Sequence, residues 1–421
     1  MRTHGIPNAS GCTTGRMSSC VGRSLVGLTL YAALLLAVPT PSYATTPVLE
    51  ATYTTSISNG WVQVERWRDP GTAFTQETFP PDGRGNQTGQ RVTFFNGVGT
   101  PNSARFLLYY APNWNTNPKT TPVLLVHGAN PNDAGAYGCG QASCPTTGLM
   151  QTLAAGGFKV FAIGFPHKNG NGYFWAEQIE DAIQAIKART GALTVDVVSW
   201  SKGAFNARMY VSSVKQSWGT AYQSDIRRLI MAGGPNNGID LSFRHSWYFS
   251  LPVYPACGGT IDGPTPHDQL VCYGVWQNGP QWTYSSAYFP GSAQMLKRWD
   301  SVYPLPTYEQ DWYTTYYGGM GFYTHGNGIV SYMGPSLVDT VRTAGTSGAV
   351  KVYNLCGNLN NIALLHNEHT GPSDGVLFIA SCNDAAGITN FGGAAVVAVN
   401  HLGLGWNTPA VNQITAWLSA L

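Results

Sequence analysis

From residue 122 onwards, the pattern of hydrophobic and polar positions alternates between continuous apolar runs and segments with helical spacing. Short apolar runs are typical of strands buried on both faces of a sheet. Ala176, Ile179, Ile183 and Ile186 recur at helical spacing between two such runs. This alternation predicts an α/β fold with a mostly parallel sheet and a site at the carboxyl ends of its strands. The predicted strands are 122–126, 158–165, 195–198, 226–231, 350–355, 376–380 and 394–399, and the predicted helices are 149–155, 176–189 and 408–418.

Two regions depart from this rhythm. Between residues 45 and 118, alternating runs at 61–67, 91–95 and 104–110 are separated by Gly, Pro and Asn, and they predict antiparallel strands. Residues 238–348 are rich in Tyr, Trp, Pro and Gly and show neither period. We interpret them as a cap-like insertion within a single domain spanning 45–421, because so many aromatic residues would be poorly tolerated in an exposed tether.

The N-terminus predicts export. Arg16 and Arg23 precede an apolar run at 25–38, and Ser42-Tyr43-Ala44 supplies the small-x-small pattern of a cleavage site. We therefore expect a signal peptide at 1–44, with Met17 as an alternative start, and a secreted protein, extracellular or periplasmic. A stable membrane anchor is disfavoured because the run is short of a full span and ends in prolines.

Composition narrows the range of partners. The chain of 421 residues has a net charge of +2 and only 10% charged residues, so nothing predicts a nucleic-acid partner. Its 22 Tyr and 13 Trp suit an exported enzyme that acts on an uncharged or apolar substrate.

Six cysteines remain after residue 44, and an even number in an exported chain favours disulfides over metal thiolates. Six cysteines allow 15 connectivities. We expect local pairs between neighbours in the sequence, namely Cys139–Cys144, Cys257–Cys272 and Cys356–Cys382.

The strand at 195–198 leads into Ser199-Trp200-Ser201-Lys202-Gly203, and a helix follows. A serine between a strand and a helix lies on a sharp turn that lifts its hydroxyl above the sheet, and the residues two before and two after it must be small. Ser199 and Gly203 meet this requirement, although glycine is usual at the first position. The pattern identifies Ser201 as a candidate nucleophile.

A serine hydroxyl needs a base to accept its proton and a carboxylate to orient that base. In enzymes with such a turn, the acid and then the histidine follow in the chain, each on a loop after a strand. His401 directly follows the last predicted strand, and Asp374 lies between the strands at 350–355 and 394–399. Asp384 is the alternative acid, although we expect it to cap a helix.

An oxyanion hole requires two main-chain N–H groups. We expect these from Lys202, after the nucleophile, and from Ala129, after His127-Gly128. The Lys202 side chain has no predicted role, and we expect it to be solvated. His366 and His369, with Glu368, are spaced as metal ligands could be, but no third ligand is near, so we expect no metal and no cofactor.

Four sequence islands, His127-Gly128, Ser199–Gly203, Ser373-Asp374-Gly375 and Asn400–Leu404, together resemble secreted α/β-hydrolases of the bacterial class 2 lipase type. More loosely, they are similar to extracellular polyhydroxyalkanoate depolymerases, whose serine motif also has a small residue in place of the first glycine. The resemblance extends over 122–404. It implies a parallel central sheet with helices on both faces, and ester hydrolysis through an acyl-serine intermediate.

Three functions remain in competition. The first is a carboxylic ester hydrolase, with a lipid or an aliphatic polyester as its apolar or polymeric substrate. The second is a silent binding protein on a hydrolase scaffold, which has no need of serine, aspartate and histidine together. The third is a peptidase using the same three residues.

Overall fold

The computed structural model describes residues 45–71, 73–79, 86–129, 148–239, 290–299, 301–304, 337–363 and 367–420. The predicted signal peptide, the cysteines at 139, 144, 257 and 272, and most of the predicted insertion lie outside these ranges. Within them, no helix is both long and apolar enough to cross a membrane.

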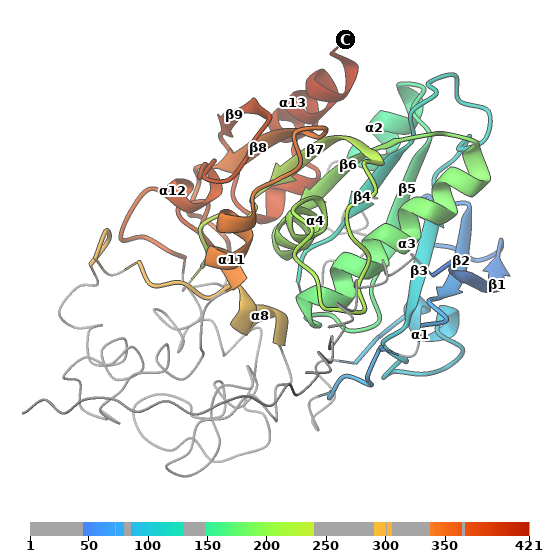
Figure 1. Cartoon of the computed structure of the whole chain (residues 1–421). Coiled ribbons are helices and arrows are strands. Elements are labelled where there is room, and N and C mark those ends of the chain that lie inside the picture. Colours follow the sequence, from blue (N-terminus) through green and yellow to red (C-terminus); the bar gives the residue numbers. More distant parts are fainter. Residues whose placement is uncertain are drawn as a thin grey trace, which may run out of the picture. The chain divides into compact units, whose positions relative to one another are not determined.

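The strands of the described ranges form a nine-stranded sheet in the order β1-β2-β3-β5-β4-β6-β7-β8-β9 (Figure 1). The three strands at the N-terminal edge are antiparallel to their neighbours, and the strands from β5 to β9 are parallel. The strands are β1 (Val48–Tyr53), β2 (Gln63–Arg68), β3 (Arg105–Tyr110), β4 (Val123–Val126), β5 (Val160–Gly164), β6 (Val195–Trp200), β7 (Ile226–Ala232), β8 (Lys351–Gly357) and β9 (Phe391–Val397).

The parallel register places the ends of the central strands side by side. Val126 pairs with Ser199, and Ser199 pairs with Met231, so β4, β6 and β7 end at the same edge of the sheet. Loops that follow these strands therefore converge there, as expected for a site in an α/β sheet.

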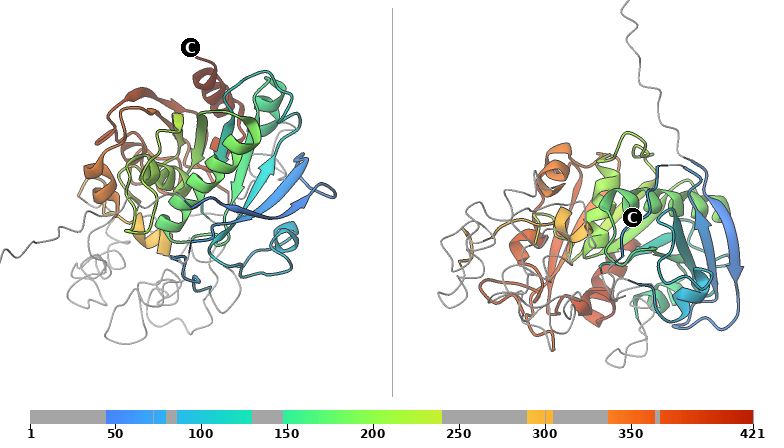
Figure 2. Two further views of the ribbon diagram at one scale, coloured as in Figure 1. Left: turned by 45° about the vertical axis from the view of Figure 1, so that its right-hand side comes forward. Right: turned by 90° about the horizontal axis from the view of Figure 1, so that it is seen from below.

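Helices cover both faces of the sheet, and each face has its own apolar core (Figures 1 and 2). One core joins the sheet to α3, α4 and α11, and the other joins it to α1, α2 and α13. The helices are α1 (Gln90–Phe94), α2 (Leu149–Ala155), α3 (Gly172–Thr190), α4 (Lys202–Val211), α8 (Pro290–Gln294), α11 (Leu337–Ala344), α12 (Ile379–Cys382) and α13 (Thr408–Ser419), with a 3₁₀ turn η3 (Leu402–Gly405). The predicted fold class, an α/β-hydrolase fold, is confirmed by this topology.

Three predictions of elements differ from the structure. Of residues 91–95, predicted as a strand, 91–94 belong to the helix α1 and Phe95 is its C-cap, with Arg91 and Phe94 buried one turn apart. Residues 376–380, predicted as a strand, lead into the short helix α12. The edge strand β1 was missed because its residues are mostly exposed or half-buried and show no apolar period.

The predicted insertion contributes two described helices. α8 is a short helix. An isolated β-bridge between Ile239 and Leu296 connects the start of the insertion to the residues just after α8. α11 buries Val338 and Val341 in the apolar core that also contains α4, so the C-terminal part of the range 238–348 belongs to the central layers.

Candidate active site

Ser201 stands in a strained backbone conformation between β6 and α4. Its φ of 55° and ψ of −128° lie outside the regions that residues with a Cβ ordinarily adopt. Such a conformation costs on the order of 1–3 kcal/mol and points to a functional constraint. Its N–H donates to the Ala232 carbonyl at the end of β7, which ties the turn to the sheet edge (2.9 Å).

The neighbours of Ser201 are small because backbone approaches closely. A Cβ on Gly203 would overlap with the His127 carbonyl oxygen, and one on Gly128 would lie 2.7 Å from the Ser201 Cβ. Ser199 is tolerated because its buried hydroxyl donates to the Ile230 carbonyl on β7 (3.1 Å). The turn therefore has the geometry predicted for a nucleophile.

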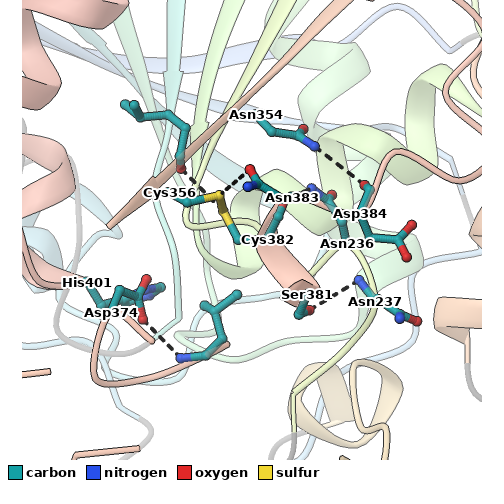
Figure 3. The surroundings of a disulfide bond; sticks show 12 residues. Asn236, Asn237, Asn354, Cys356, Asp374, Ser381, Cys382, Asn383, Asp384 and His401 are labelled. Carbon is teal, nitrogen blue, oxygen red and sulfur yellow. Dashed lines mark hydrogen bonds and ion pairs between the residues drawn. A yellow bond between two sulfur atoms is a disulfide. The ribbon is translucent and has the colours of Figure 1, made fainter. Parts of the chain in front are cut away.

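The structure brings Asp374 and His401 together. Asp374 Oδ2 lies 2.7 Å from His401 Nδ1, and both residues are buried (Figure 3). Asp374 Oδ1 accepts the N–H groups of Val376 and Leu377 at 3.0 and 2.9 Å, and the His401 N–H donates to the Asp374 carbonyl at 2.8 Å. These bonds hold the Nδ1–H tautomer and leave Nε2 as the nitrogen that accepts a proton.

Two contacts place His401 at the serine turn. Trp200, the residue before Ser201, donates its indole N–H to the His401 carbonyl (3.1 Å). Gly233, directly after β7, has a positive φ of 57°, and a Cβ there would lie 2.9 Å from the His401 ring. The imidazole therefore needs a glycine at position 233, which was not identified from the sequence as part of the site.

The loop that carries Asp374 is closed at its base by the disulfide Cys356–Cys382, so that predicted pair is confirmed (Figure 3). It connects the end of β8 to α12. Gly357 follows directly, and a Cβ there would lie 3.0 Å from the Asp374 Cβ. The cross-link and this close packing fix the base of the loop.

Asp384 lies apart from the imidazole. Its carboxylate pairs with Arg342 at 3.0 Å and accepts the Ala386 N–H at 2.9 Å. It follows α12 and bonds the residue two positions on, so the prediction that it caps a helix N-terminus is wrong. It stabilises a turn and joins that turn to α11.

The two predicted oxyanion donors belong to segments that meet at the serine turn, because a Cβ on Gly128 would lie 2.7 Å from the Ser201 Cβ. Lys202 is the first residue of α4, and Ala129 is two residues beyond His127 at the end of a described range. The expectation that the Lys202 side chain is solvated is wrong, because this residue is fully buried. Its Nζ donates to Asn206 Oδ1 (2.9 Å) and lies 3.2 Å from the centroid of the Trp175 ring.

A carboxylate far away in the sequence accompanies this buried lysine. Glu77 Oε1 accepts the Asn171 N–H at 2.6 Å, while its buried Oε2 has no hydrogen-bond partner among the described residues. Desolvation raises the pKa of Glu77 to about 7, against the opposing effects of the Asn171 bond and the Lys202 charge. Desolvation also lowers the pKa of Lys202 well below its usual range, and Glu77 partly opposes this. No sequence signal linked residue 77 to the site.

The described residues hold no group of three or more His, Cys, Asp and Glu side chains arranged to bind a metal ion. His366 lies outside the described ranges. His369 Nδ1 is 2.9 Å from the Asn367 carbonyl oxygen, and Glu368 accepts from the Thr370 hydroxyl at 2.9 Å. These two side chains therefore serve the local fold of the loop before Asp374.

The matching family model is described as "Domain of unknown function (DUF7379)", and it covers residues 102–257. This range contains the serine turn but neither Asp374 nor His401. None of the curated proteins matches the chain.

Among solved structures, the chain is similar to the Bacillus licheniformis lipase BlEst2 in its mature form. The two are 12% identical over 73% of this chain and 96% of that one, with a TM-score of 0.41. It is also similar to the esterase RhEst1 from Rhodococcus sp. ECU1013 (12% identity, 75% and 95% covered, TM-score 0.38) and to the carboxylesterase CesB from Bacillus subtilis (13%, 75% and 88%, 0.37). The fold of this chain is established by its own sheet topology.

Proposed function

We propose that the protein is a secreted serine hydrolase that cleaves carboxylic esters through an acyl-serine intermediate. The observation that carries the proposal is the strained turn at Ser201 beside a buried Asp374–His401 pair. A strained serine alone or an Asp–His pair alone has structural explanations. Their meeting at one edge of the sheet gives the three groups that acyl transfer requires.

The proposed reaction runs in two halves. His401 Nε2 takes the Ser201 proton as the hydroxyl oxygen attacks the ester carbonyl, and the N–H groups of Lys202 and Ala129 bind the resulting oxyanion. The tetrahedral intermediate collapses, the alkoxide leaves with the proton from His401, and an acyl-serine remains. A water molecule, deprotonated by the same imidazole, then releases the acid and restores Ser201.

We further propose that the substrate is a lipid or an aliphatic polyester. The high aromatic content supports an apolar substrate, and described aromatic residues of the insertion reach the acid loop: Tyr303 stacks on Phe378 with ring centroids 4.2 Å apart. Export is supported by the N-terminal apolar run and by the disulfide at the acid loop, because disulfides persist in oxidising compartments.

Hydrolysis of p-nitrophenyl acyl esters tests the proposal. We expect the mature protein to release p-nitrophenol, and we expect Ser201→Ala to lower kcat by at least about a thousandfold without loss of folding. Ser224→Ala is the matched control, because Ser224 is also a serine at positive φ (56°), in an exposed turn. We expect this control to keep full activity.

Two outcomes contradict the proposal. A wild-type protein inactive on a panel of acetyl to palmitoyl esters would favour a silent binding protein. Faster cleavage of the matching p-nitroanilides than of the esters would favour a peptidase.

A further inference from the structure

The side chain of Lys202, the residue after the candidate nucleophile, is fully buried. Its Nζ lies over the face of Trp175 and donates to Asn206 one turn further along α4. Gly291 of α8 closes the site, since a Cβ there would overlap with the Lys202 Cε. A lysine next to a candidate nucleophile is thus held at three points and excluded from solvent.

The Trp175 ring is contacted on both of its faces. Phe165 stacks on its ring with centroids 3.8 Å apart and planes 9° apart. A stacked ring and an ammonium at 3.2 Å do not fit on the same face, so Phe165 and Lys202 lie on opposite faces of Trp175. The ring is therefore fixed from both sides.

The stack ends at His127, two residues before the predicted oxyanion donor Ala129. The His127 ring meets Phe165 and Trp175 edge-on, with centroids 5.0 and 5.5 Å away. The Phe165 N–H donates to His127 Nε2 (3.3 Å), so Nδ1 carries the proton and donates to the Gly128 carbonyl (2.7 Å). A continuous set of contacts thus leads from the side chain of Lys202 to the peptide that precedes Ala129.

We propose that Lys202 is a positioning residue for the oxyanion hole. Through its contact with Trp175, the Lys202 side chain fixes the position of the Ser201–Lys202 peptide relative to the Gly128–Ala129 peptide. The N–H donors of Lys202 and Ala129 therefore keep a constant relative position. The inference rests on the proposed function, because it concerns the same ester-cleaving site. The predicted chemistry required only the main-chain N–H of Lys202, and the inference adds a role for its side chain.

Stability alone gives a weak reason for a cation here. Burying an ammonium carries a large desolvation cost, so a buried ion pair is weak evidence that the charge is there for stability. Glu77 offsets part of this cost. A cation–π contact holds an unbranched lysine side chain on one face of a ring. The sulfur–aromatic contact of a methionine in the same place would hold its side chain only weakly.

Lys202→Met tests the proposal with paired substrates, a p-nitrophenyl ester and its thionoester. Sulfur accepts hydrogen bonds poorly, so the ratio of the oxoester rate to the thionoester rate measures how well the N–H donors meet the oxyanion. We expect kcat on the oxoester to fall about tenfold to a hundredfold, KM to change less than about threefold, and the rate ratio to fall about tenfold.

Arg208→Met is the matched control. Arg208 is a fully buried cation on the same helix, and its guanidinium donates to the Asn236 and Ala386 carbonyls, away from the stack. We expect a lower Tm with an unchanged rate ratio. A structural role for Lys202 predicts the same for Lys202→Met, so an unchanged ratio in that variant overturns the proposal.

Trp175→Phe covers the case in which Lys202→Met does not fold. It keeps a ring on Phe165 and narrows the face under the Lys202 Nζ. It also removes an indole N–H for which the described residues supply no hydrogen-bond partner. We expect the rate ratio to fall in this variant too, and an unchanged ratio again overturns the proposal. Wild-type protein that hydrolyses neither substrate contradicts the proposed function itself, which separates the two failures.

Discussion

At the scale of single residues, the site depends on which carboxylate faces the imidazole. Asp374 accepts two main-chain N–H groups on one oxygen and contacts His401 with the other, so its orientation is fixed before any substrate binds. Asp384, ten positions later, is paired with a guanidinium instead. The two aspartates therefore predict opposite effects when each is changed to asparagine.

We expect Asp374→Asn to lower kcat by about ten-thousandfold, because an amide in that place favours the wrong imidazole tautomer. Its melting temperature should stay near that of the wild type. Asp384→Asn should keep full activity and lose about 1 kcal/mol or less of unfolding free energy with its partly exposed ion pair. Steady-state kinetics and thermal melts of both variants check this, and an inactive Asp384→Asn beside an active Asp374→Asn would show that the acid lies on the other loop.

The candidate residues were predictable because each follows a recognisable strand, and the order of serine, acid and histidine is imposed by the fold. The burial of the Lys202 side chain was not predictable, because it depends on Trp175, Glu77 and Gly291, which lie elsewhere in the sequence. A lysine beside a helix start gives no local signal of burial.

At the scale of elements, short segments were the least predictable. Residues 91–95 alternate like a strand, but they form a helical turn in which Phe94 and Phe95 are buried and Val92 is half-buried. Tertiary contacts hold this turn in place. Phe94 packs on Tyr53 with centroids 5.0 Å apart, and its carbonyl accepts from the Arg66 guanidinium at 3.0 Å. The long helix α3 was predictable because its apolar spacing persists over several turns.

The helix α3 also buries acidic side chains that the apolar pattern did not reveal. Glu177, Glu180 and Asp181 lie along it, near Asp69 and Asp225. Burial raises the pKa of Glu180 to about 8, its bond with Gln184 opposes this, and the neighbouring carboxylates raise it further. Burial followed by neighbouring carboxylates also raises the pKa of Asp181 well above its usual range.

These shifts predict a stability that falls as pH rises. A carboxyl group whose pKa is higher in the folded state than in the unfolded state binds its proton more tightly when folded. Its stabilisation is complete below the unfolded pKa of about 4.5 and is lost as pH rises through about 8 for Glu180. We expect Tm to fall by several degrees between pH 6 and pH 9, and Glu180→Gln, which is neutral throughout, to flatten this slope. A Tm that rises over the same range would contradict the assigned burial.

At the scale of the whole molecule, the alternation of strands and helices predicted a parallel sheet and a site at its carboxyl edge. The structure has the parallel sheet, with β5, β4, β6, β7, β8 and β9 parallel and helices on both faces (Figure 2). The three-stranded antiparallel edge was only partly predictable, because β1 is held by the sheet and by ion pairs of Glu50 with Arg66 and Arg105. Such contacts leave no periodic trace in the sequence.

The central claim, that Ser201 is an activated nucleophile, is tested most directly by covalent labelling. Mature protein is treated with a fluorophosphonate ester, digested, and mapped by mass spectrometry. We predict one phosphonate adduct per chain, on Ser201, and none in Ser201→Ala, while Ser224→Ala is labelled at the wild-type rate. Undiminished labelling of Ser201→Ala, or a folded wild-type protein that takes up no phosphonate, would contradict the account.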